Sequence, residues 1–136
     1  MSKIKLVAPE AYTLLTPKEK DEICNGCGAK GGIPVPNTMY LLNIKEACQV
    51  HDFMYHSSMH KDDKVICDLV FKHNLFQIIE HETWFGFVEK LRKIIAEEYY
   101  LVVSIWGNDA YWTKDKLLKG DKHEEPIYTN LLTYLD

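Results

Sequence analysis

The sequence predicts a mainly α-helical protein, and three observations lead to that prediction. Apolar residues recur at three- and four-residue steps over long stretches, which is the spacing of one helix face. Several of these stretches follow a helix-start signal, and β-branched residues are few and show no strict alternation. With 136 residues, 46% of them hydrophobic, the chain can bury one core without disulfides, and we expect a single domain over residues 1–136.

The first helix is expected to begin at "TPKE" and to end at about residue 24. Thr16 can cap it, Pro17 suits the first helical position, and Glu19 can close a capping box. The helix ends there because "CNGCGAKGGIPVP", residues 24–36, contains four glycines and two prolines. Such a loop can supply turns with positive φ and exposed main-chain carbonyls.

Two further helices are expected on either side of a short turn. "NIKE" predicts a helix start at residues 43–46, with Asn43 as the cap, and this helix runs to Ser58 or His60. Asp62 or Asp63 can cap the next helix, which runs to about residue 80.

A long amphipathic helix follows "HETWFG" and ends at Gly107, and a shorter one starts at residue 108 or 109 and stops at residue 120. "YYLVVSIW", residues 99–106, is more apolar than a surface helix needs, which predicts a central position for the long helix. The aromatic clusters at residues 83–87 and 110–112 are more often core than an acyl-chain slot.

Charge and hydropathy exclude several classes of protein. A formal net charge of −4 argues against nucleic-acid binding and gives no attraction to anionic membranes. Residues 1–15 lack the apolar core of a signal peptide, and no later stretch has transmembrane length without a charge. As written, the chain is expected to be soluble and cytosolic. Its four cysteines suit one or two bridges, one metal site, or free thiols.

The second and third helices are joined by a very short turn near residue 60, which predicts antiparallel neighbours. His51 and Asp68 each lie about eight residues from that turn, so equal helical rise brings them level. Asp68 is the only acid in the apolar run 65–79, and a buried carboxylate is costly unless it is paired. A bond to His51 would fix the tautomer and leave the other ring nitrogen as a proton acceptor, as a hydrolytic site requires.

Two residues of this hairpin also have simpler interpretations. Asp68 could face solvent or pair with Lys64 or Lys72, each four residues away. Asp52 points about 100° around the helix from His51 and could face the glycine loop. One carboxylate with several main-chain carbonyls would suit Ca²⁺ there, whereas the simpler alternative is a solvated acid.

A zinc site is a rival hypothesis for the same residues. Cys24-x-x-Cys27 and Cys48-x-x-His51 form a plausible Cys₃His zinc spacing. Zn²⁺ would then stabilise an interaction module, and both aspartates would be incidental. This hypothesis leaves Asp68 without a role.

The segments "CGAKGG", "ACQVHDFMY" and "CD" together resemble the secreted phospholipase A2 superfamily over roughly residues 24–70. In that family a glycine loop precedes Cys-x-x-His-Asp-x-x-Tyr on a helix, and an antiparallel helix supplies a Cys-Asp pair. The compact hairpin is most similar to the small bacterial, fungal and viral members. The resemblance implies a family-like core over about 16–80, a C-terminal helical part over about 84–120, and a tail, 121–136, without a clear assignment.

The resemblance also implies roles for individual residues. His51 would be the base that activates a water, Asp68 would hold its ring, and Tyr55 would hydrogen-bond to Asp68. Cys27 and Cys48 fall where the family has a disulfide between the calcium loop and the helix.

The same resemblance implies a bound Ca²⁺ that polarises an ester carbonyl. Asp52 would bind it together with the carbonyls of Gly26, Gly28 and one of Lys30 or Gly31.

The expected function is therefore calcium-dependent hydrolysis of a phospholipid carboxylic ester, with a phospholipid or another lipid ester as partner and a peripheral membrane contact. A zinc-stabilised interaction module and a non-catalytic phospholipase A2-like binding domain are the alternatives. The resemblance favours export from the cell, in contrast to the cytosolic location that the chain as written suggests.

Overall fold

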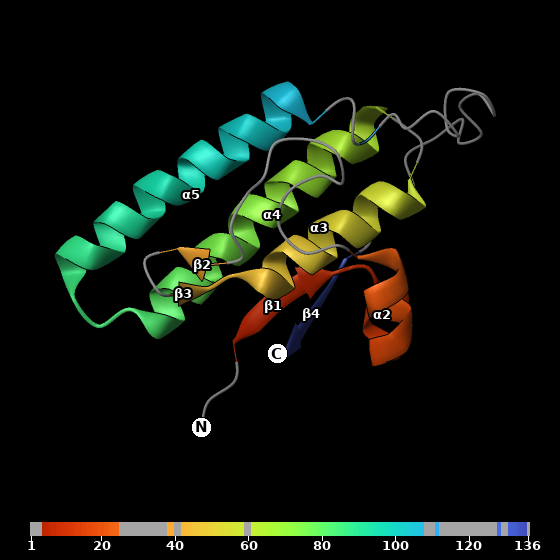
Figure 1. Cartoon of the computed structure of the whole chain (residues 1–136), viewed down its shortest axis with the longest axis horizontal. Coiled ribbons are helices and arrows are strands. Elements are labelled where there is room, and N and C mark those ends of the chain that lie inside the picture. The colour runs from red at the N-terminus through yellow and green to blue at the C-terminus, as the bar shows by residue number, and fades with distance from the viewer. Residues whose placement is uncertain are drawn as a thin grey trace.

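The computed structural model describes residues 4–24, 38–39, 42–58, 61–107, 111, 128 and 131–135. Within these residues the chain is mainly helical, which confirms the mainly α-helical part of the prediction. Three long helices lie side by side: α3 (Lys45–Ser57), α4 (Lys61–Glu82) and α5 (Gly86–Trp106), with α4 in the middle (Figure 1). The remaining elements are the short helices α1 (Glu10–Thr13) and α2 (Pro17–Ile23) and the strands β1 (Lys5–Ala8), β2 (Thr38–Met39), β3 (Leu42–Asn43) and β4 (Leu132–Leu135).

Helix α2 begins as the sequence predicts. The Thr16 side chain accepts a hydrogen bond from the Glu19 N–H at 3.2 Å, and the Glu19 carboxylate accepts one from the Thr16 N–H at 3.0 Å. Pro17 occupies the first helical position. The helix ends at Ile23, just before the glycine-rich segment, so both of its predicted boundaries are confirmed.

The start of α3 differs from the prediction. Ile44 occupies the cap position, and Asn43 instead ends β3 and accepts a hydrogen bond from the Lys45 N–H at 2.9 Å. Glu46 accepts hydrogen bonds from the hydroxyls of Tyr12, at 2.6 Å, and Tyr134, at 2.9 Å. Glu46 thus joins the first turn of α3 to both terminal segments, a role that a local capping pattern cannot reveal.

The turn before α4 also differs in detail. Helix α4 starts at Lys61, so Asp62 and Asp63 lie within its first turn and neither is the cap residue. Asp63 is fully buried and accepts a hydrogen bond from the Tyr128 N–H at 3.1 Å. The predicted shorter helix after residue 107 lies outside the described residues, except for Tyr111, which is buried.

Two small antiparallel sheets were not predicted. β1 pairs with β4, with Lys5 opposite Leu135, and β2 pairs with β3. The side-chain amide of Asn74 donates to the Val7 carbonyl and accepts from the Val7 N–H, both at 2.8 Å, and so fastens β1 to α4. Each strand is too short to show an alternating pattern, and β1 and β4 also lie far apart in the sequence.

Helix α5 has the predicted bounds but not the predicted position. Its N–H···O bond from Gly107 to Val103, at 2.9 Å, marks the expected end. The helix packs mainly on α4 at the edge of the molecule (Figure 1), and Ala96 is its only buried residue. The expected central position of residues 99–106 is therefore wrong, because α5 packs mainly on α4 and each of these residues keeps part of its surface exposed.

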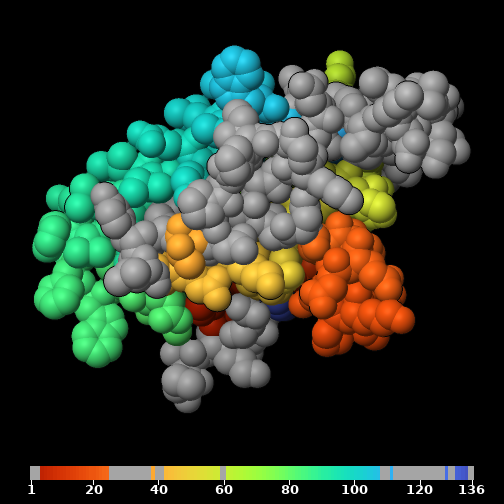
Figure 2. Space-filling model, in the orientation of Figure 1, coloured from red at the N-terminus to blue at the C-terminus, as the bar shows by residue number. Residues whose placement is uncertain are grey.

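The aromatic cluster at residues 83–87 is likewise exposed, contrary to its expected place in the core. Trp84 is 91% exposed, and Figure 2 shows that the side chains of the α4–α5 turn stand out at one end of the molecule. Other exposed apolar residues of α5 are Phe87, Leu91, Ile94, Leu101, Ile105 and Trp106. In the part of the chain that the structure describes, no helix is both long and apolar enough to cross a membrane.

Candidate active site

The α3–α4 hairpin brings His51, Tyr55 and Asp68 together. His51 and Tyr55 occupy successive turns of α3, and Asp68 faces them from α4. His51 Nε2 lies 2.8 Å from Asp68 Oδ1, and the Tyr55 hydroxyl donates to the same oxygen at 2.6 Å. All three residues are buried, with Asp68 only 2% exposed. The pairing predicted from the equal distances to the turn is therefore present.

The surroundings of the His51 ring define which nitrogen can act. The ring packs between Tyr55, at 4.1 Å between centroids, and Phe71, at 4.7 Å. An ionised Asp68 can only accept hydrogen bonds, so Nε2 of a neutral His51 must carry the proton. Nδ1 is then the ring nitrogen that can accept a proton. The arrangement orients an imidazole as a proton acceptor.

Asp68 has a third partner on its other oxygen. Lys64 Nζ donates to Asp68 Oδ2 at 2.8 Å, and both side chains are buried. The predicted Lys64 contact and the predicted His51 contact thus coexist, whereas Lys72 pairs with Glu97 at 2.8 Å. Burial alone would raise the pKa of Asp68, but its hydrogen bonds to His51, Lys64 and Tyr55 outweigh burial and hold the pKa below its usual range.

Tyr55 is held as a hydrogen-bond donor. Burial, the charge of Asp68 and the hydrogen bond to it raise the pKa of Tyr55 far above its usual value, so its hydroxyl keeps its proton. Its ring meets that of Tyr111 edge to face at 5.0 Å. Gly107, at the end of α5, lies so close that a methyl group there would be 2.7 Å from the Tyr55 hydroxyl.

The cysteines near the site fall into two groups. Cys48 is buried and disulfide-bonded, whereas Cys24 and Cys67 are buried and are not disulfide-bonded. Cys27, the partner that the resemblance implies for Cys48, lies outside the described residues, so that pairing stays a prediction. The Cys24 thiol donates to the Gln49 carbonyl at 3.2 Å, and burial together with the charge of Asp52 raises its pKa to about 11.

Asp52 occupies the position next to His51 on α3 and is half-buried. Its charge acts on Cys24, the first residue of the glycine-rich segment. The carboxylate is therefore near the start of that segment. The carbonyl ligands that the resemblance implies, those of Gly26, Gly28 and Lys30 or Gly31, lie outside the described residues. No cluster of three or more His, Cys, Asp or Glu side chains that could hold a metal occurs within the described ranges.

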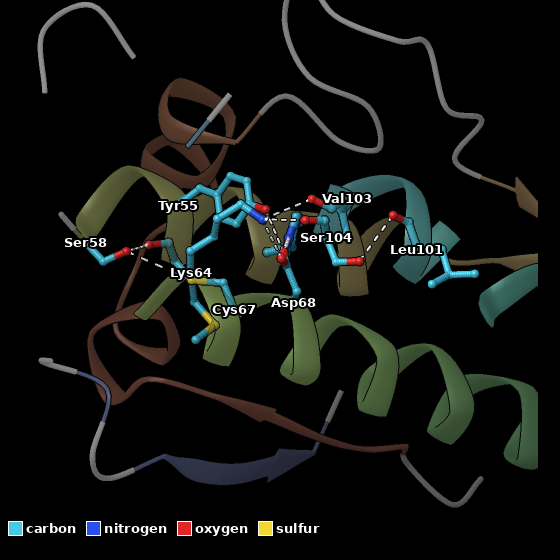
Figure 3. Close-up of polar contacts among 10 residues, drawn as sticks. Tyr55, Ser58, Lys64, Cys67, Asp68, Leu101, Val103 and Ser104 are labelled. Carbon is cyan, nitrogen blue, oxygen red and sulfur yellow. Dashed lines mark hydrogen bonds and ion pairs between the residues drawn. The ribbon is translucent and has the colours of Figure 1, made fainter. Parts of the chain in front are cut away.

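Sequence reasoning missed how Lys64 is held. Its ammonium also donates to the carbonyls of Val103, at 3.1 Å, and Ser104, at 3.4 Å, near the end of α5 (Figure 3). The spacing of Lys64 and Asp68 by four residues predicted one contact as an alternative, but no signal in the sequence places residues 103 and 104 beside them. Comparison with protein-family models, with curated proteins and with solved structures gives no match to this chain.

Proposed function

We propose that this protein is a calcium-dependent, phospholipase A2-like hydrolase that cleaves a carboxylic ester of a phospholipid. The observation that carries this proposal is the buried His51–Asp68 hydrogen bond of 2.8 Å, which leaves Nδ1 as the available proton acceptor. A base with a fixed tautomer and a buried orienting acid are two of the parts that hydrolysis by an activated water requires.

In the proposed reaction, His51 Nδ1 takes a proton from a water molecule while the water oxygen bonds to the ester carbonyl carbon. The Asp68 carboxylate stabilises the imidazolium that results, and Tyr55 keeps the carboxylate in place. When the ester C–O bond breaks, the same nitrogen returns the proton to the leaving alcohol. The products are a fatty acid and a lysophospholipid.

The proposed metal is Ca²⁺, and the chemistry of Asp52 and the glycine-rich segment supports it. Asp52 supplies a half-buried carboxylate adjacent to the base, near the start of a segment with four glycines. A hard cation prefers carboxylate and carbonyl oxygens, which Asp52 and a glycine-rich loop can provide. When bound, Ca²⁺ would supply positive charge that stabilises the oxyanion.

The contacts of the predicted zinc ligands favour the hydrolase over the zinc alternative. A zinc site would need Cys24, Cys48 and His51 as ligands together with Cys27. Cys48 is disulfide-bonded and so has no thiolate to offer a metal, and the Cys24 thiol donates to the Gln49 carbonyl at 3.2 Å. Metal analysis of the purified protein is expected to find less than one zinc per chain, and one equivalent of tightly bound zinc would instead support the interaction module.

The decisive experiment measures fatty-acid release from phospholipid vesicles with millimolar calcium and with a chelator. The wild-type protein is expected to release fatty acid only with calcium, and His51→Gln to lower the rate by about 10²- to 10⁴-fold, the usual range for the loss of a general base. His56→Gln is the matched control, because His56 lies on the same helix but is exposed. Absence of release by the wild-type protein, with calcium still raising its melting temperature, would favour the non-catalytic binding domain.

A further inference from the structure

Lys64 is the least expected of the buried side chains that hydrogen-bond to Asp68, the others being His51 and Tyr55. Its side chain is only 9% exposed, and it makes hydrogen bonds to Asp68 Oδ2 and to the carbonyls of Val103 and Ser104. A lysine ammonium has three N–H donors, so these three acceptors use its full capacity. The two carbonyls belong to the last turn of α5, the end of a helix that attracts positive charge.

We propose that Lys64 is a positioning residue for the His51–Asp68 pair. The two oxygens of Asp68 have different partners: Oδ1 accepts hydrogen bonds from His51 and Tyr55, and Oδ2 accepts one from Lys64. Because Lys64 holds Oδ2, the carboxylate cannot rotate without losing that bond. Oδ1 therefore stays directed at the imidazole. The consequence for catalysis rests on the proposed function, whereas the effect on the His51 tautomer does not.

The charge of Lys64 contributes as well as its geometry. A buried carboxylate remains ionised only if nearby positive charge or hydrogen bonds offset the loss of water. With Lys64 in place, Asp68 stays an acceptor, which is the state that keeps the proton on His51 Nε2. Figure 3 shows that Lys64 lies where α5 meets the α3–α4 hairpin. The last turn of α5 therefore holds the Lys64 ammonium against Asp68.

A purely structural role for Lys64, as an anchor of α5 on α4, is the rival explanation. Lys72 provides the matched control, because it also lies on α4 and pairs with Glu97 of α5 at 2.8 Å. Lys64→Met removes the hydrogen bonds to the Val103 and Ser104 carbonyls of α5, and Lys72→Met removes the contacts with Glu97 and Tyr100 of α5. Of the two lysines, Lys64 is the one that contacts Asp68.

The first test is the ¹⁵N NMR spectrum of the His51 ring in the intact protein without added metal. The wild-type protein and Lys72→Met are expected to show a single Nε2–H tautomer, and Lys64→Met a mixture of tautomers. An unchanged single tautomer in Lys64→Met would overturn the proposal. This readout needs no enzymatic activity, so it decides the role of Lys64 even if the wild-type protein hydrolyses no phospholipid.

The second test uses kinetics once hydrolysis is established. Lys64→Met is expected to lower kcat by about 10- to 100-fold, the usual effect of losing an outer hydrogen-bond partner of a site, with KM little changed. In an Asp68→Asn background, Lys64→Met should cause no further loss, because Lys64 acts through Asp68. The double variant has no unpaired buried charge, so it keeps the test available if Lys64→Met alone does not fold. A further loss in the double variant would show that Lys64 does not act through Asp68.

Discussion

Two helix hairpins share α4, and they differ sharply in what they bury. The α3–α4 hairpin buries charged and polar side chains, among them His51, Lys64 and Asp68. The α4–α5 hairpin instead leaves apolar side chains exposed: α5 buries only Ala96, and its residues Ile94 and Ile105 are more than half exposed. Similar antiparallel packing thus encloses charged side chains within the core of one hairpin, here called the polar hairpin, and leaves apolar side chains exposed on the other.

The difference follows from the number of neighbours that each helix has. Helix α3 contacts both α2 and α4, and β1 packs on α4, so the α3–α4 interface is covered from several sides. Among the described elements, helix α5 packs mainly on α4, and every residue of α5 except Ala96 keeps part of its surface exposed. Burial in this protein is decided by the surrounding elements rather than by the hydropathy of a helix. The following predictions test that comparison.

The largest loss of stability is expected from Asp68→Asn in the polar hairpin. The substitution leaves the buried Lys64 ammonium without its ion pair, which typically costs about 3–5 kcal/mol in the free energy of unfolding. Denaturant unfolding at neutral pH measures the change. A loss below about 1 kcal/mol would indicate that the Lys64–Asp68 pair is in contact with water. The α3–α4 hairpin would then not bury its charged side chains, and the contrast between the two hairpins would disappear.

Asn74→Leu should destabilise the contact between α4 and β1 by about 2–4 kcal/mol. Leucine has a similar volume, but it leaves both the N–H and the carbonyl of Val7 without the Asn74 side chain. Thermal unfolding provides the measurement. Asn74→Asp, which keeps an acceptor for the Val7 N–H but loses the donor, separates the two hydrogen bonds.

Gly107→Ala should cost about 1–3 kcal/mol, the range expected for overpacking. The φ angle of Gly107 is −76°, so the backbone itself accepts alanine, but the methyl group would meet the Val103 carbonyl and lie 2.7 Å from the Tyr55 hydroxyl. Gly86→Ala is the control, since nothing lies within 4 Å of a methyl group there. Equal melting temperatures for the two variants would contradict the close approach.

Acidification should weaken the polar hairpin selectively. The pKa of Asp68 is lower in the folded than in the unfolded chain, so its contribution to stability is present above about pH 4 and is lost as the pH falls through the folded pKa. Unfolding free energies of the wild-type protein and Asp68→Asn should therefore converge as the pH falls below about 4. A constant difference between the two at all acidic pH values would show that Asp68 does not titrate in this way.

The smallest effect is expected on the outer face of α5. Ile94 is 57% exposed, and Ile94→Ala should change the free energy of unfolding by less than about 0.5 kcal/mol. The same substitution at Ile79, which is fully buried on α4, should cost about 2–5 kcal/mol. A large loss at Ile94 would mean that a partner covers this face in solution, and sedimentation analysis of the wild-type protein would then detect an oligomer.

Local signals in the sequence predicted local structure well. The capping box at Thr16 and the end of α5 at Gly107 are confirmed because both depend on residues within one helical turn. The facing of His51 and Asp68 was also predictable, since a short turn fixes which positions of two helices oppose each other.

Contacts between distant segments were not predictable in the same way. Asn74 looks like an ordinary helix residue, and nothing near it indicates that its amide bonds to Val7. Lys64 likewise gains the Val103 and Ser104 carbonyls only through the packing of α5. The hydropathy of residues 99–106 failed to predict their exposure because a sequence pattern gives the apolar face of a helix but not the number of its neighbours.

The pairing of β1 with β4 has a consequence for the order of folding. Because β4 lies far downstream of β1 in the sequence, Leu6 and Ala8 have no strand partner until residues 132–135 have been made. Closing so long a loop carries an entropic cost that the α3–α4 hairpin does not have. The hairpin with His51 and Asp68 can therefore form early, and the strand pair that joins the two ends of the described chain completes the fold last.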